Sequence, residues 1–182
     1  MPGLLQTTQQ TGQPPGGMEV VQDDADALNV AVKSFEASVK VTPVISAAAI
    51  YAAGDNVGGL LTFANVAREA GSGAVLKDVT IVDDDGEDAA LELWLFDQTF
   101  TAGADNDAWS PSEADLENLL TIVTTADGAY FAAGATYSAA VIEVSRGMSL
   151  VGTSLFGRLV TRGTPTYTAV DDLSVRVNVL QD

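Results

Sequence analysis

The strongest constraint on the fold of this chain is a strict two-residue alternation of apolar and polar side chains. It is clearest near the C-terminal end, where every second residue is apolar: Leu173, Val175, Val177 and Val179. The residues between them are Ser174, Arg176 and Asn178. Because side chains two apart lie on one face of an extended strand, this run predicts a strand with one buried and one exposed face.

Similar short runs recur along the chain. The predicted strands span residues 37–42, 48–51, 58–63, 75–82, 91–96, 138–144, 155–162 and 173–180. About eight short strands at this spacing are typical of an antiparallel sandwich or barrel. The long loops at 97–112 and 125–137 favour a jelly roll over a tight up-and-down barrel. The predicted fold class is therefore all-β, an antiparallel β-sandwich that is jelly-roll-like.

Few segments of the sequence favour a helix. Ser112 can cap one short helix that follows Pro111 and runs towards Leu120. Residues 120–125 alternatively form a strand, and residues 23–36 fit either a helical turn or a first strand.

Two local signals interrupt the strand pattern. Pro43 has no N–H to donate to a sheet, which indicates a strand end, a bulge or a sheet edge. The pair Gly58–Gly59 indicates a bulge or a close approach of two backbones.

The N-terminal residues differ from the rest of the chain. Residues 1–18 carry no charge, and the Pro-Pro-Gly-Gly run beginning at Pro14 cannot continue a helix or a central strand. We expect an extended arm over residues 1–22 and a β-sandwich domain over residues 23–182. The arm either folds back on its own domain or, as we favour, lies on a neighbouring subunit. Its expected partner-binding residues are Leu4, Leu5, Pro14 and Pro15.

Charge and composition restrict the function. The 182 residues include 25 acidic and 8 basic ones, a net charge of −17, which argues against nucleic acid or an anionic membrane as partner. No apolar run approaches the length of about 18–20 residues that a membrane-spanning helix needs. Neither cysteine nor histidine is present, so thiolate and imidazole chemistry are excluded. We expect no enzyme and no cofactor.

The most suggestive chemical feature is an acidic run between two predicted strands. It consists of Asp83, Asp84, Asp85, Glu87 and Asp88. Because Asp and Gly suit turns, the run predicts a solvated hairpin connection. The weaker alternative is a metal site.

For calcium, the candidate ligands are Asp83, Asp85 and Glu92, at positions three, five and twelve of a calcium-binding loop. Position one would be Ile81, which has no ligand atom, and the flanking segments are strands rather than helices.

A second candidate site lies in the loop at 97–112. Its carboxylates and aromatic rings are Asp97, Asp105, Asp107, Phe96, Phe100 and Trp109. Paired carboxylates beside stacking rings are typical of saccharide sites. We favour the alternative that the rings anchor the loop to the core or to a neighbour. The arginines of the C-terminal half are expected in ion pairs within or between subunits: Arg146, Arg158, Arg162 and Arg176.

Three stretches carry a family resemblance. They are AIYAAGDNVGGLLTF, the pair LKDVTIVD and LELWLFD, and YTAVDDLSVRVNVLQD. Over roughly residues 39–182 the chain resembles uncharacterised structural proteins of bacteriophage virions, of the capsid decoration (cement) kind. The resemblance implies a homotrimer on the outer surface of the capsid, bound to the major capsid protein, without active-site residues. The alternatives are another virion subunit (head fibre base, tail or baseplate) or a carbohydrate-binding module.

Overall fold

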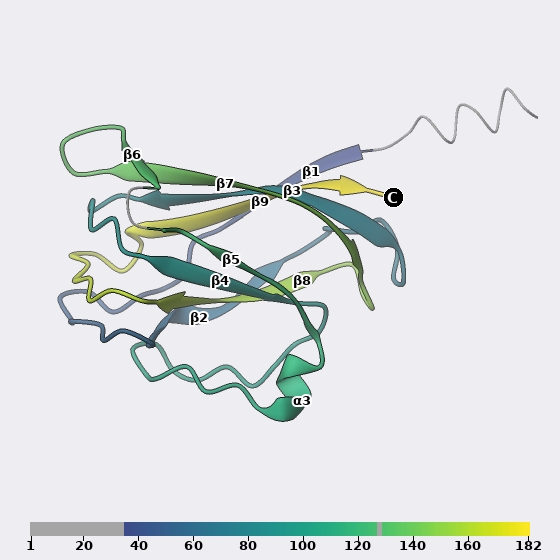
Figure 1. Ribbon diagram of the computed structural model, residues 1–182, viewed down its shortest axis with the longest axis horizontal. Helices are drawn as coiled ribbons and strands as arrows, with labels where there is room; N and C mark the ends of the chain where they lie inside the picture. Colours follow the sequence, from purple (N-terminus) through teal and green to yellow (C-terminus); the bar gives the residue numbers. More distant parts are fainter. Residues whose placement is uncertain (1–34, 127–128) are drawn as a thin grey trace, which may run out of the picture. The chain divides into compact units, whose positions relative to one another are not determined.

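The computed structural model describes residues 35–126 and 129–182 (Figure 1). Nine strands in this part form two antiparallel sheets, which face each other. The five-stranded sheet has the order β1 (Phe35–Val41), β9 (Leu173–Gln181), β3 (Gly73–Asp83), β7 (Ser138–Ser149) and β6 (Tyr130–Ala132). The four-stranded sheet has the order β2 (Asn56–Phe63), β8 (Leu155–Thr161), β4 (Leu91–Phe96) and β5 (Leu119–Thr124).

The strand order identifies the fold. Without the short β6, the two sheets read β1-β9-β3-β7 and β2-β8-β4-β5. This is the order of an eight-stranded jelly roll, in which the chain passes repeatedly from one sheet to the other. The all-β, jelly-roll-like prediction is therefore confirmed.

The alternating residues fill the space between the sheets. Leu173, Val175, Val177 and Val179 of β9 are fully buried, as the sequence predicts. On β3, the buried Leu76 and Val79 are three positions apart rather than two, because the register shifts between Leu76 and Asp78. Removing this apolar area from water is the main favourable contribution to folding.

Several local predictions are also confirmed. β1 ends at Val41, just before Pro43. β2 has a register shift between Val57 and Leu61, and a Cβ on Gly58 would lie 2.5 Å from the Pro43 Cβ. Gly58 has a φ of +77°, so the predicted bulge and the close approach coincide at this one residue.

The single-turn helix α3 (Glu113–Leu116) begins after Ser112, as predicted. The Ser112 hydroxyl accepts the Asp115 N–H, and the Asp115 carboxylate accepts the Ser112 N–H, which is a capping box. The chain then enters β5, so the alternative of a strand near residues 120–125 is the correct one.

Two predictions are wrong. Residues 48–51 do not form a strand, because Ala48 has a φ of 59° and its N–H binds the Tyr167 carbonyl. The loop predicted at 125–137 contains the three-residue strand β6, which pairs with β7.

The expected arm at 1–22, with Leu4, Leu5, Pro14 and Pro15, lies outside the described residues, as do residues 23–34. Within the described part, no helix has the length and apolarity required to cross a membrane.

Candidate interaction surface

The acidic run connects β3 to β4, which lie in different sheets, so the predicted hairpin is wrong and the run crosses between the sheets. Its first residue is also not solvated. Asp83 is fully buried, and its carboxylate accepts the backbone N–H groups of Asp85, Gly86 and Asp88 at 2.9–3.0 Å. Burial raises the pKa of Asp83, and the three N–H groups oppose that rise. The prediction that the run faces water is therefore wrong at Asp83, because folded backbone donors replace water there.

Two further acidic side chains of this connection bind the β8–β9 connection. Asp85 accepts the N–H and the hydroxyl of Thr168, and Glu87 accepts the N–H of Thr166. The Asp172 carbonyl, from the β8–β9 connection, accepts the Asp84 N–H at 2.7 Å. These contacts hold the β3–β4 connection against the β8–β9 connection. The run is thus a structural tie between two loops.

The three calcium candidates have different partners. Asp83 binds its own loop and Asp85 binds Thr168, while Glu92 pairs with Arg162 at 2.6 Å. Arg162 lowers the pKa of Glu92. In the residues that the structure describes, no three carboxylates are grouped so that they could hold a metal ion.

The 97–112 loop packs its aromatic rings inward. Phe96 is fully buried and Phe100 nearly so, with ring centroids 4.4 Å apart. Trp109 packs edge-on against both, at 6.4 and 5.7 Å. Phe96 and Phe100 are buried and have no free face for a sugar, whereas Trp109 is half-buried. The contacts among the three rings anchor the loop to its own core. Asp105 accepts the Tyr51 hydroxyl at 2.8 Å and the Gly58 N–H, and so ties the loop to the start of β2.

Arg158 is the residue whose role sequence reasoning missed. It is fully buried on β8 and donates to the carbonyls of Gly58 and Gly103. Its guanidinium lies 5.8 Å from the centre of the Trp109 ring. Burial lowers the pKa of Arg158. Among the described residues, the expected ion pair is found for Arg162 but not for Arg158, which donates to backbone carbonyls instead.

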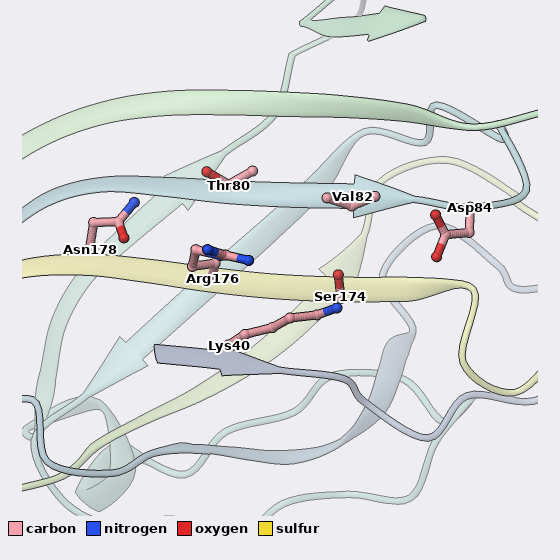
Figure 2. Close-up of a pocket in the computed structure, with 7 residues that line it drawn as sticks. All are labelled: Lys40, Thr80, Val82, Asp84, Ser174, Arg176 and Asn178. Atoms are coloured by element: carbon pink, nitrogen blue, oxygen red, sulfur yellow. The ribbon is translucent and has the colours of Figure 1, made fainter. Parts of the chain in front are cut away.

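The outer face of the five-stranded sheet is the candidate interaction surface. A shallow depression of about 410 Å³ lies across β1, β9 and β3. Figure 2 shows the side chains that line it: Lys40, Thr80, Val82, Asp84, Ser174, Arg176 and Asn178. Two are cations and one is an acid, so the lining has the opposite sign to the chain as a whole.

Lys40 and Arg176 are directly opposite each other on β1 and β9, and Arg176 is also opposite Thr80 on β3. Both cations are exposed. Among the described residues, neither has a carboxylate at ion-pair distance, whereas Lys77 pairs with Glu36 on the same sheet. Beside the carboxylate of Asp84, the depression therefore presents two cations that are unpaired among the described residues, an arrangement suited to an anionic group.

Comparison with known proteins gives no family. No family model and no curated protein matches the chain. The solved structures that it resembles include that of infectious bursal disease virus, Gx strain, with 10% identity and a TM-score of 0.40. That match covers 82% of this chain but only 32% of the viral chain. Another is the structure of tomato aspermy virus, with 9% identity and a TM-score of 0.36 over 89% of this chain and 93% of that one.

Proposed function

We propose that the protein is a bacteriophage capsid decoration protein, which binds the outer shell and bridges neighbouring capsomers. The observation that carries the proposal is the jelly-roll strand order, in a chain without histidine or cysteine. The jelly roll is used in viral capsids, and also in lectins and cupins. The sequence resemblance to phage virion proteins favours the first of these uses.

The charge of −17 fits this role. A decoration protein is present at high local concentration and has to leave packaged DNA alone, and a strongly acidic surface serves both needs. Internal pressure pulls neighbouring shell subunits apart. Burying additional surface across each junction opposes that separation, and this action needs no catalytic group.

We expect the arm at 1–22 to be the segment that binds the major capsid protein. An extended arm adds main-chain pairing and apolar contacts far from its own domain. Local three-fold positions on an icosahedral shell would accommodate a homotrimer.

The decisive experiment is electron microscopy of gold-labelled protein bound to intact particles. A decoration protein labels the whole head. Label at a single vertex would instead support a tail, baseplate or head-fibre subunit and would refute decoration.

A deletion tests the arm separately. Removing residues 1–17 should leave domain folding intact, measured by circular dichroism, and weaken attachment to empty shells in a sedimentation assay. If the truncated protein still bound empty shells with full affinity, the arm would not be the segment that binds the shell.

A further inference from the structure

The opposed pair Lys40 and Arg176 is unfavourable in the described structure. Directly opposite residues of an antiparallel pair have their Cβ atoms about 4.5–5.5 Å apart, and like charges there are destabilising. The chain has 25 acidic residues, yet no described one pairs with either cation. An anion supplied from outside would remove this repulsion.

The neighbouring sheet edge is also open. β1 is the outermost strand of its sheet, and in the described part of the chain its seven residues pair only with β9. An unpaired strand edge presents a row of N–H and C=O groups that a further strand can use. The residue of an added strand that lies opposite Lys40 would share its face, because paired residues of neighbouring strands point the same way.

We propose that the edge of β1 that is unpaired among the described residues receives an extended segment of a partner polypeptide, with an acidic side chain opposite Lys40. Main-chain hydrogen bonds would supply affinity, and the carboxylate beside Lys40 and Arg176 would supply selectivity. The acidic residue would extend an existing row across the sheet, which runs through Lys40, Arg176, Thr80 and Val141. Only the identity of the partner as a shell protein depends on the proposed function.

The test uses the full chain and blocked model peptides, followed by amide chemical shifts in NMR. The first peptide is Ser-Val-Thr-Val-Asp-Val-Thr-Val-Ser, whose Asp and Thr side chains share one face. A second peptide has Asn in place of Asp, and a third has Pro in place of two Val residues. At millimolar peptide, we expect the first to shift amides of residues 37–41 and of Arg176.

The selectivity is tested with two variants. The Asn peptide should bind about two- to fivefold more weakly than the Asp peptide, as expected for one partly exposed ion pair. The variant Lys40→Gln should reduce this preference, and the double variant Lys40→Gln with Arg176→Gln should bind both peptides equally. Lys77→Gln, which changes a cation already paired with Glu36 on the same sheet, should keep the preference.

Three results would overturn the proposal. No shift on β1 with any peptide would mean that the edge is closed to strands. Equal binding of the Pro peptide would mean a purely ionic contact. A change in the sedimentation of the protein alone on Lys40→Gln would assign the edge to a second copy. None of these results bears on whether the protein labels the phage head, so this proposal and the proposed function fail independently.

Discussion

Arg158 on β8 and Arg176 on β9 lie in opposite sheets. The first is buried, whereas the second is exposed. Arg158 is buried beneath the 97–112 loop, where it donates to backbone carbonyls and lies beside the Trp109 ring. Arg176 stands exposed on the outer face, opposite another cation. The comparison shows that the fold buries an arginine where irregular backbone offers acceptors. In a regular sheet the carbonyls are already paired with the N–H groups of neighbouring strands. An exposed charged side chain there interacts with water or with a partner instead.

The largest effect is expected from Arg158→Met, which keeps side-chain bulk but removes the donors to the carbonyls of Gly58 and Gly103. Leaving buried acceptors unpaired should lower the free energy of unfolding by about 3 kcal/mol. Urea denaturation measures the loss. The matched variant Arg176→Met should change stability by less than about 0.5 kcal/mol. Equal losses in the two variants would show that burial does not distinguish these arginines.

Trp109→Ala should have the next largest effect, because the ring packs against Phe96, Phe100 and Arg158. We expect a loss of about 2–3 kcal/mol, slightly below that of a fully buried aromatic residue. The control is Phe131→Ala on the outer-face side, where the ring is 74% exposed and its removal should be close to neutral. A neutral Trp109 variant would mean that the loop is not anchored by its rings.

The same contrast between a buried and an exposed charge exists for two acidic residues, Asp83 and Asp84. In Asp83→Asn the new amide N–H₂ would face a backbone N–H in place of a carboxylate oxygen, so we expect a loss of about 1–2 kcal/mol at pH 7. Asp84→Asn, which changes the exposed neighbour, should change stability by less than about 0.5 kcal/mol.

The pH dependence of Asp83 has a definite sign. Its folded pKa is raised above the unfolded value of about 3.9, so its contribution to stability is fully present below that value and is lost as pH rises through the folded pKa. The stability of the wild type relative to Asp83→Asn should therefore increase as pH falls from 7 towards 4. Urea titrations of both proteins across this range measure the difference, and a decrease would contradict the assigned cause.

The smallest effect is expected from removing the exposed pair. Lys40→Gln with Arg176→Gln should raise stability slightly, because it removes repulsion between opposed cations. Lys77→Gln should lower stability slightly, because it removes an ion pair with Glu36. Both changes should shrink in high salt, which screens exposed charges. A loss of stability in the double variant would indicate that the two cations are stabilised within the fold.

The regular parts of the fold were predictable because their signal is local. Alternation in β4 and β9 and the Ser112 cap depend on residues within a few positions of each other. The bulge at Gly58 was predictable as well, since paired glycines are rarely placed inside a strand without such a reason.

The irregular contacts were not predictable because they depend on distant segments. Arg158 finds its acceptors 100 and 55 positions away along the chain, and charge alone suggested an ion pair. Asp83 resembles its acidic neighbours in sequence, and only the turn of the loop places three N–H groups around it. The residue types around Ala48 favour a strand, but backbone hydrogen bonds to the β8–β9 connection give this segment a different conformation.

The position of β9 has a consequence for biosynthesis. β9 is the most C-terminal of the described strands, yet it lies between β1 and β3, so it joins strands that were synthesised long before it. Until translation has passed Gln181, β1 lacks the one partner strand that it has in the described part of the chain, and β3 lacks its pairing with β9. At about 5–20 residues per second, the nascent β1 waits for seconds on the ribosome. Pairing across such a long sequence separation is also slow, so the five-stranded sheet is expected to close late in folding.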